Sequence, residues 1–415
     1  MEIAQESLRE YARLLIQVGL NVQKGQVLVI ASPVECAYFA RLCTEEAYKV
    51  GCREVVMNWS DDAMERMRFL YAEEETFDTL PEWQSKLLNG YARDGAAYLS
   101  IVAKDPQNLD GVDSKRITRW QKARGEALVD FNRLELHGGF PWCVAAVPIR
   151  SWARQVFPGE PDEKAVKNLW EAILKSVRIC GDGQGVEHWK HHVEKLNRRI
   201  ERLNKFHFQS LHYFNNRGTD LIVQLPKSHI WQSCSEKTAC GQKFVSNIPT
   251  EEIFTAPLKQ GVEGVVYSAR PLVYSGTVID RFSFVIQEGR IVEARAEQGE
   301  EALLAALGAD EGASYFGEVA LVPYDSPVSR QDTMFYNTLL DENAACHFAF
   351  GKAYPSVSGG QDMSQEQLIA LGLNDSILHV DFMVGTPDLT IIGTTDNGKE
   401  IPVFENGNFS KLIDD

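Results

Sequence analysis

LDENAACHFAFGKAYP, residues 340–355, and, after a polar spacer, SILHVDFMVGTPD, residues 376–388, decide how the second half of the chain folds. We expect the first stretch to form a helix that begins with Asp341 as its N-cap and ends near Tyr354, because the proline that follows disfavours helical backbone. On the 3.6-residue period of a helix, His347 and Tyr354 then lie on one face among apolar neighbours. Two polar side chains on a buried helix need polar partners.

The second stretch supplies such partners. Residues 377–384 alternate as a strand does, with apolar side chains on one face and His379 and Asp381 on the other. A buried charge there is costly unless it is paired or bound to a metal. The structural alternative is a neutral histidine that is hydrogen-bonded to its carboxylate within the core. A second histidine nearby, His347, weakens that alternative.

Composition limits the classes of protein to consider. The 415 residues are enough for two or more domains, and 58 acidic against 42 basic side chains give a net charge of -16. Such a charge argues against a nucleic-acid partner or an anionic membrane. The eight cysteines form no C-x-x-C pair and are expected to be reduced thiols of a cytoplasmic protein. We find no signal peptide and no apolar run that could span a membrane.

Strands and helices alternate in the first half of the chain. Continuous apolar runs between helices predict a buried parallel sheet in a β-α-β arrangement. The expected strands are residues 27–31, 54–58, 97–102 and 143–149. From residue 206 onward, alternating segments and hairpin-type turns predominate. The predicted fold is therefore an α/β N-terminal domain with a parallel sheet, residues 1–205, and a mixed α+β, strand-rich catalytic domain, residues 206–415.

Two other features of the first half lack the motifs of a site. The glycine cluster at residues 181–185 follows a helix rather than a strand, so it is interpreted as a linker and not as a nucleotide-binding loop. The helix at residues 186–205 contains His188 and His192 one turn apart, but no glutamate stands where zinc motifs require one. A solvated helix face explains these histidines better.

Acidic residues elsewhere complete a candidate metal site. Glu251 and Glu252 stand in NIPTEEIFTAP, residues 247–257, and adjacent side chains in extended chain point opposite ways, so one of them faces a given site. Glu318 begins an apolar strand. Three carboxylates and two imidazoles are a usual ligand set for two divalent ions that share one carboxylate, and the lack of cysteine argues against a structural zinc site. The candidate ligands are Glu252, Glu318, His347, His379 and Asp381.

These motifs resemble one known family. NIPTEEIFTAP, the glutamate at 318, LDENAACHFAFGKAYP and LHVDFMVGTPDL are similar to the thermophilic aminopeptidase family of metallopeptidases, which contains the aminopeptidase T, S and II types. The similarity extends along the chain to YARLLIQVGLNVQKGQ and LHYFNNRGTDLIVQLP. It implies that the five candidate residues bind the metals, with Tyr354 as a further active-site residue. It also implies short peptide substrates and a homodimer that encloses an internal cavity.

The chain departs from this resemblance at one place. After Trp231 it has Gln232-Ser233-Cys234-Ser235, where we expect small, glycine-rich sequence in relatives. We expect this departure to alter the rim of the pocket or the approach to the site, and not the metals.

A mechanism follows as a hypothesis. Two divalent ions (zinc, cobalt, manganese or magnesium) would activate a water for attack on the peptide bond, and Tyr354 could donate a hydrogen bond to the oxyanion. We favour Glu251 as general base, because a carboxylate beside ligand Glu252 stays free to accept a proton, and Glu318 is its rival. The alternatives are a dinuclear metallohydrolase of another amide and a non-catalytic scaffold of the same fold.

Overall fold

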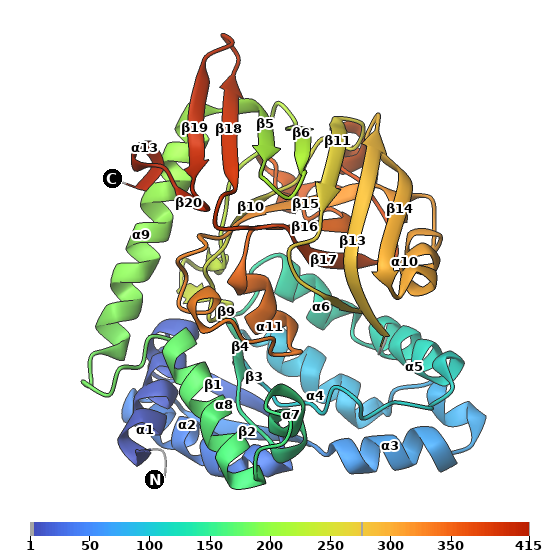
Figure 1. Cartoon of the computed structure of the whole chain (residues 1–415). Coiled ribbons are helices and arrows are strands. Elements are labelled where there is room, and N and C mark those ends of the chain that lie inside the picture. The colour runs from blue at the N-terminus through green and yellow to red at the C-terminus, as the bar shows by residue number, and fades with distance from the viewer. Residues whose placement is uncertain (1–3, 275–276, 415) are drawn as a thin grey trace. The chain divides into compact units, whose positions relative to one another are not determined.

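The computed structural model describes residues 4–274 and 277–414 (Figure 1). The chain forms two compact units. The first unit contains the residues up to 191 together with 235–249 and 334–339, and the second contains 192–234, 250–333 and 340 onward. The boundary between residues 191 and 192 thus falls within the helix Gly185–Phe206, and the later segments 235–249 and 334–339 belong to the first unit again. Within the described residues, no helix combines the length and the apolar character needed to cross a membrane.

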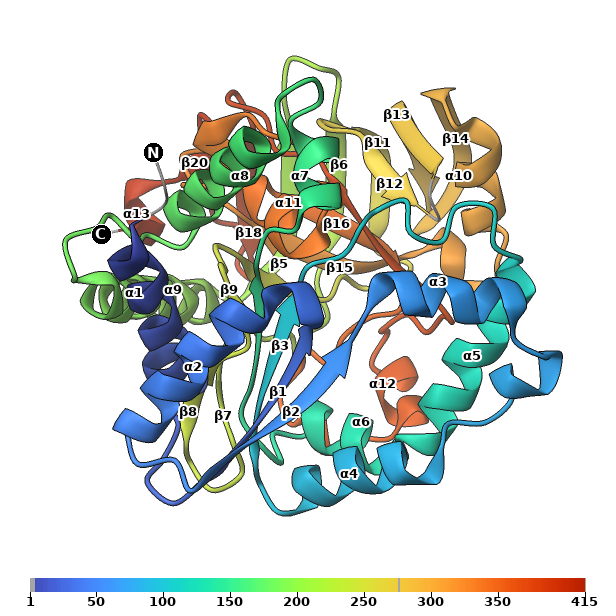
Figure 2. The ribbon, with the colours of Figure 1, turned by 90° about the horizontal axis from the view of Figure 1, so that it is seen from below.

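The first unit is built on a five-stranded sheet in which every pairing is parallel (Figure 2). Its strands, in spatial order, are β2 (Glu54–Ser60), β1 (Val27–Pro33), β3 (Ala97–Val102), β4 (Trp142–Ala146) and β9 (Asn247–Ile248). The expected α/β domain with a parallel sheet is confirmed. The fourth strand ends at Ala146, three residues earlier than predicted. A two-stranded ribbon, β7 (Ser235–Lys237) and β8 (Lys243–Val245), belongs to the same unit.

Helices separate the strands of this sheet, as the sequence predicted. They are α1 (Gln5–Leu14), α2 (Ala37–Lys49), α3 (Asp62–Tyr71), α4 (Glu82–Arg93), α5 (Ser114–Ala127), α6 (Val129–Leu136), α7 (Arg150–Val156), α8 (Asp162–Ser176) and α9 (Gly185–Phe206). Residues 181–184 of the glycine cluster lie between α8 and α9, as a linker would, and Gly185 begins α9.

The second unit contains two antiparallel sheets. One has four strands in the order β10 (Ile253–Thr255), β15 (Phe316–Leu321), β16 (His347–Gly351) and β17 (His379–Met383). The other has nine strands, in the order β12, β13, β11, β6, β5, β18, β19 and β20, with β14 paired to β13. Their bounds are β5 (Phe208–Phe214), β6 (Asp220–Gln224), β11 (Val262–Tyr267), β12 (Leu272–Tyr274), β13 (Thr277–Gln287), β14 (Arg290–Gln298), β18 (Thr390–Thr395), β19 (Glu400–Glu405) and β20 (Asn408–Phe409).

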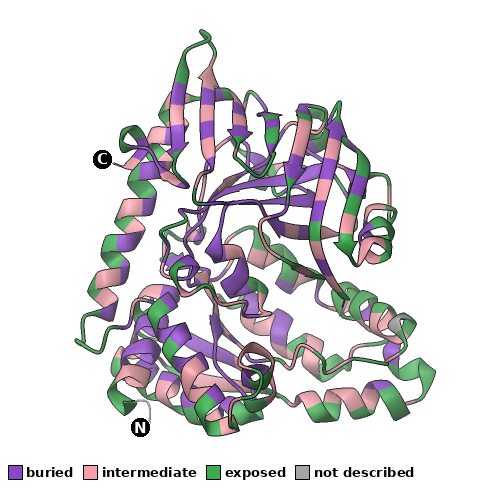
Figure 3. Ribbon diagram, in the orientation of Figure 1, coloured by how far each residue is buried: buried purple, intermediate pink, exposed green. Residues whose placement is uncertain are grey.

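Aromatic side chains fill the space between these two sheets. Phe284 of β13 packs edge-on against Phe382 of β17, with ring centroids 5.2 Å apart, and Phe316 of β15 stacks on Phe348 of β16 at the same distance. Every residue of β15 and β16 is buried (Figure 3). The strand-rich second unit matches the predicted fold class. Its short helices are α10 (Glu300–Leu307), α11 (Thr338–Asp341), α12 (Gln365–Ala370) and α13 (Lys411–Asp414).

The predicted helix over residues 341–354 is wrong. Helix α11 ends at Asp341, a 3₁₀ turn covers Glu342–Ala344, and His347 begins strand β16. The reason is tertiary: β16 is hydrogen-bonded on both sides, to β15 and to β17, so a continuous apolar run serves as a buried central strand.

Candidate metal centre

Strands β15, β16 and β17 bring four predicted ligands, Glu318, His347, His379 and Asp381, to one face of the four-stranded sheet. Glu318 and Asp381 both pair with Ala349 of the central strand, one from each side. The small side chain of Ala349 leaves space between the two carboxylates. On β17 the predicted alternation is confirmed: Val380 and Phe382 enter the core, and His379 and Asp381 lie on the other face.

His347 is oriented by its own backbone. Its Nδ1 lies 3.1 Å from the carbonyl oxygen of Ala345, and since a carbonyl can only accept, Nδ1 carries the proton. Nε2 is therefore the ring atom that can bind a metal. It lies 3.3 Å from Oε2 of Glu252 and 3.5 Å from Oε1 of Glu318.

His379 is held in the same manner. Its Nδ1 donates to the carbonyl oxygen of Lys352 at 2.7 Å. Its Nε2 lies 3.2 Å from Oδ1 of Asp381 and 3.5 Å from Oε2 of Glu318. The side chain of His379 is 22% exposed whereas that of His347 is 1% exposed, so the cluster is most accessible at the His379 end.

The five predicted ligands thus form two groups that share one residue. Glu252, Glu318 and His347 offer ligand atoms that all lie within 4.8 Å of one another, and so do Glu318, His379 and Asp381. The two oxygens of Glu318 point to different histidines. This arrangement suits a carboxylate that bridges two metal ions.

The neighbouring carboxylates raise the pKa of both histidines. Burial lowers the pKa of His347, but Glu252 and Glu318 beside Nε2 outweigh burial and raise the pKa well above its ordinary value. Burial also lowers the pKa of His379, but the Asp381 and Glu318 carboxylates outweigh this effect and raise the pKa to about 9. In the metal-free protein both imidazoles therefore bind protons that a metal would have to displace.

The pKa values of the two carboxylates Glu318 and Asp381 are shifted in opposite directions. Burial raises the pKa of Glu318 in spite of its hydrogen bond with His347. Desolvation also acts to raise the pKa of the half-buried Asp381, but its hydrogen bond with His379 and the charges of His379 and His347 lower it. Oxygen and imidazole nitrogen donors of this kind suit divalent cations, and a cation would relieve the repulsion among the buried carboxylates.

Tyr354, the predicted hydrogen-bond donor, lies beside this cluster. Its ring packs against the His379 imidazole with centroids 5.0 Å apart. Desolvation, and then the carboxylates of Glu318 and Asp381, raise the pKa of Tyr354 above its ordinary value. The phenol therefore keeps its proton at neutral pH and can donate it to a hydrogen bond.

Glu251, the predicted general base, is buried next to the predicted ligand Glu252. Its Oε2 lies 3.7 Å from Nε2 of His192, and that nitrogen also donates to the carbonyl oxygen of Thr250 at 2.8 Å. His192 was expected on a solvated face of α9, and this prediction is wrong because the residue is only 8% exposed. Its buried position beside residues 250 and 251 separates it from the solvated part of the helix.

The structure adds Glu342 to the acidic residues of the cluster. Desolvation, followed by the charges of Glu252 and Asp381, raises the pKa of Glu342 well above its ordinary value. Asn343 joins the two acidic segments, because its Oδ1 accepts from the Glu251 N–H at 2.7 Å and its Nδ2 donates to Oε1 of Glu342 at 3.5 Å.

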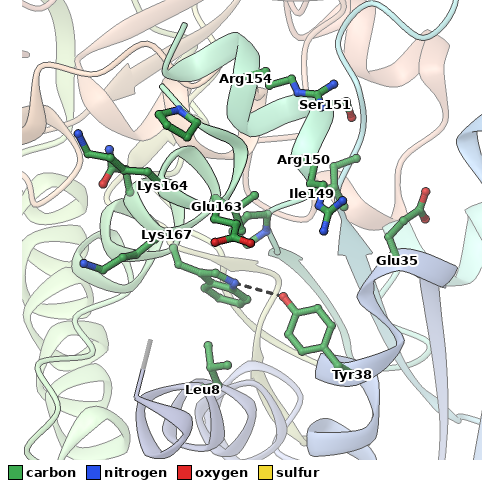
Figure 4. Close-up of a pocket in the computed structure, with 15 residues that line it drawn as sticks. Leu8, Glu35, Tyr38, Ile149, Arg150, Ser151, Arg154, Glu163, Lys164 and Lys167 are labelled. Atoms are coloured by element: carbon green, nitrogen blue, oxygen red, sulfur yellow. Dashed lines mark hydrogen bonds between the residues drawn. The ribbon is translucent and has the colours of Figure 1, made fainter. Parts of the chain in front are cut away.

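A large cavity of about 1370 Å³ lies within the first unit (Figure 4). Helices α1, α2, α7 and α8 contribute to its wall, where Trp170 Nε1 donates to the Tyr38 hydroxyl at 3.2 Å. Arg150 and Lys167 are among its charged residues. None of the five ligand residues lines it, and it contains no candidate metal group among the described residues. The cluster in the second unit is therefore the candidate site.

The cluster defines a class, the proteins that bind divalent metal ions through oxygen and nitrogen ligands. Comparison with known proteins makes the class specific. The family model described as thermophilic metalloprotease (M29) matches residues 4–409. The chain therefore belongs to the thermophilic metalloprotease family M29, which confirms the resemblance expected from the motifs.

Individual relatives are similar over their full length. Aminopeptidase AmpS of Bacillus subtilis is 43% identical over 99% of this chain and 100% of its own. Aminopeptidase 2 of Geobacillus stearothermophilus is 41% identical over 98% of each chain. The solved structure of wild-type AmpT from Thermus thermophilus matches with a TM-score of 0.91 and 37% identity, covering 98% of this chain and 99% of that one.

Proposed function

We propose that this chain is a dinuclear metal-dependent aminopeptidase that removes N-terminal residues from short peptides. Membership of the metalloprotease family supports the hydrolysis of peptide bonds, and the names of the full-length relatives support action at the N-terminus. The observation that supports a dinuclear site is the position of Glu318, whose two oxygens lie 3.5 Å from Nε2 of His347 and of His379 respectively.

The charge of the cluster supports two ions. Glu252, Glu318, Glu342 and Asp381 would carry four negative charges when ionised, which two divalent cations would balance. Zinc, cobalt, manganese and magnesium are all compatible with carboxylate and imidazole donors. We propose Glu318 as the bridging ligand and Glu342 as a further carboxylate that stabilises the bound charge.

Such ions, when bound, supply a water of lowered pKa and polarise the scissile carbonyl. Residues of the protein are proposed for the roles of general base and hydrogen-bond donor to the oxyanion. Glu251 is proposed as the general base, and its carboxylate lies 3.7 Å from the protonated Nε2 of its neighbour His192. Tyr354 is proposed to donate its hydroxyl proton in a hydrogen bond to the developing oxyanion. Asn343 fixes the Glu251 backbone through the 2.7 Å hydrogen bond.

The alternatives differ in what they require of the substrate. A hydrolase of another amide would not need a free amine, whereas an aminopeptidase does. A non-catalytic scaffold has no use for this set of buried acidic and imidazole side chains, whose burial is costly without metal.

Three further proposals concern the setting of the enzyme. We propose a homodimer, on the basis of the family resemblance, to be tested by light scattering coupled to gel filtration. We propose a cytoplasmic location, because all eight cysteines are free thiols. We also propose that residues 206–415 provide the catalytic domain, since all five ligands fall within them.

The decisive experiment compares leucyl anilide with its N-acetyl counterpart, before and after chelation and metal addition. We expect cleavage of the free-amine substrate alone, lost on chelation and restored by a divalent metal. Equal turnover of the acetylated compound would favour another amide hydrolase. Chelator-insensitive cleavage would overturn the metal mechanism, and no cleavage with any metal would leave a different amide substrate or the scaffold.

A further inference from the structure

Cys234 lies against a metal ligand. Its Sγ is 3.3 Å from Oε1 of Glu252, and the residue is only 6% exposed. The segment around it was expected to alter the rim of the pocket and not the metals. The structure instead places its cysteine in direct contact with the carboxylate that completes the buried half of the cluster.

Backbone pairing fixes this contact. Gln232 and Phe254 form an antiparallel bridge with hydrogen bonds of 3.0 and 2.9 Å, so the segment leading to Cys234 runs beside β10, which Glu252 precedes. On the other side, Asn204 bonds both the N–H and the carbonyl of Trp231, at 2.8 and 3.0 Å. The thiol is therefore placed by an anchored backbone rather than by a freely rotating surface side chain.

Glu252 is thereby supported in the same way as the histidine ligands. The Nδ1 atoms of His347 and His379 each bond a backbone carbonyl, which leaves Nε2 for a metal. In Glu252 the thiol occupies Oε1, and the other oxygen, Oε2, lies 3.3 Å from Nε2 of His347. Outer partners of this kind orient metal ligands and limit their motion.

We propose that Cys234 is a positioning residue of the metal site, which holds Glu252 with Oε2 directed at the metal through an S–H···Oε1 hydrogen bond. The proposal rests on the metal-dependent function proposed above. Because the thiol acts as a donor to a carboxylate that is itself the ligand, Cys234 is not a metal ligand. A serine hydroxyl, which is also a donor and of similar size, should replace it, whereas alanine should not.

The test measures metal affinity rather than turnover. Zinc dissociation constants of full-length wild type, Cys234→Ala and Cys234→Ser would be obtained by competition with a chromogenic chelator. We expect about 10- to 100-fold weaker zinc binding for the alanine variant and an affinity close to wild type for serine. Cys52→Ala is the matched control, because Cys52 is also buried but its thiol bonds backbone carbonyls in the first unit.

Each contrary result has a separate meaning. Unchanged zinc affinity in Cys234→Ala, with metal-free protein folded by circular dichroism, overturns the proposal. Equal weakening in the serine variant, together with a sulfur-to-cobalt charge-transfer band in the cobalt-loaded wild type, would make Cys234 a direct ligand and also overturn it. A wild type that binds neither zinc nor cobalt would instead refute the metal site itself.

Discussion

Phe316 and Glu318 stand two residues apart on β15 but face opposite sides of the sheet. Phe316 stacks on Phe348 in the core, and Glu318 faces the histidines of the cluster. A β-bulge explains this, because Phe316 pairs with Phe350 and Glu318 already pairs with the adjacent Ala349, which leaves Gly317 as an extra residue. Without the bulge, the side-chain period of two would turn Glu318 into the aromatic core.

The bulge predicts a strong effect of Gly317→Ala. A Cβ atom at Gly317 would overlap the backbone oxygens of Gly351 and Lys352, which cannot move as a flexible side chain can. We expect a loss of stability of about 1–3 kcal/mol and a larger loss of metal affinity, since Glu318 belongs to both ligand groups. Urea unfolding and zinc titration would measure the two effects.

Gly125→Ala provides the control for that substitution. Gly125 lies within helix α5, and a Cβ added there meets no atom within 4 Å. Alanine should be neutral or slightly stabilising at this position. If Gly317→Ala behaved like Gly125→Ala in both measurements, the bulge would not be what positions Glu318.

His379→Ala should separate metal binding from folding. The side chain is 22% exposed at the edge of the cluster, so its removal leaves no deep cavity in the core. We expect the variant to fold, to bind less metal than the wild type because one of the two ligand groups is incomplete, and to lose activity. Metal content by atomic emission and circular dichroism would show this. His212→Ala, which removes a surface histidine paired with Asp220, should change neither. Full activity of His379→Ala without metal would end the metal hypothesis.

The strand that presents His379 and Asp381 could be predicted from the sequence, because its alternation is a local property of the chain. His347 was predicted on a helix and lies instead on a strand, where it is grouped with Glu252 and Glu318. Phe348 and Phe350 alternate with His347 and Ala349, and this alternation, which is typical of a strand, is visible in the sequence. The caps and the following proline favoured helix, and only the pairing of β16 with two neighbours decides for a strand.

Other parts of the site depend on contacts between distant segments. Nothing local in the sequence reveals that Gly317 is an extra residue, because the bulge exists only relative to β16. Cys234 meets Glu252 through the bridge between Gln232 and Phe254. Glu342 reaches the cluster from a turn that the sequence suggested was the start of a helix. In each case the sequence gives the type of residue, but not the distant residues that it contacts in the fold.

Glutamine substitutions should separate the roles of Glu251 and Glu342. A general base can be replaced by its amide without loss of metal, so Glu251→Gln should lower kcat by about 10²- to 10⁴-fold with metal content unchanged. Glu342, whose pKa is raised by burial and by the charges of Glu252 and Asp381, should act on metal binding. Glu342→Gln should therefore weaken zinc affinity at least as much as it lowers kcat.

The same measurements on Glu318→Gln complete the comparison. This variant should lose metal from both groups, because Glu318 is common to them. If Glu251→Gln kept most of its kcat while a metal-loaded Glu318→Gln or Glu342→Gln lost it, the assignment of Glu251 as base would be wrong.

Tyr354→Phe should affect the chemical step alone. The raised pKa of Tyr354 keeps the phenol protonated, and loss of one donor to an oxyanion costs about 10²- to 10³-fold in kcat. We expect KM and zinc affinity to stay close to wild type. Tyr324→Phe is a suitable control, because Tyr324 is 39% exposed compared with 45% for Tyr354. A fall in zinc affinity in Tyr354→Phe would instead indicate a role at the metal.

The raised pKa of His379 predicts how pH affects the metal-free protein. Its ordinary value of 6.5 is raised to about 9 in the fold, so the folded state binds this proton more tightly than the unfolded chain does. The resulting stabilisation is fully present below pH 6.5 and is lost as pH rises through about 9. His347 is shifted in the same direction. The Tm of metal-free protein should therefore fall between these two pH values.

Metal binding should show the opposite trend over the same pH range. Zinc needs the neutral imidazoles, so its affinity should increase from pH 6.5 to about 9, with release of protons on binding. Calorimetry of metal-free protein in buffers of different ionisation enthalpy would count those protons, and scanning calorimetry would follow Tm. In His379→Ala the fall in Tm should be shallower and fewer protons should be released. A metal-free Tm that rose with pH over this range would show that the histidines are not protonated by the surrounding carboxylates.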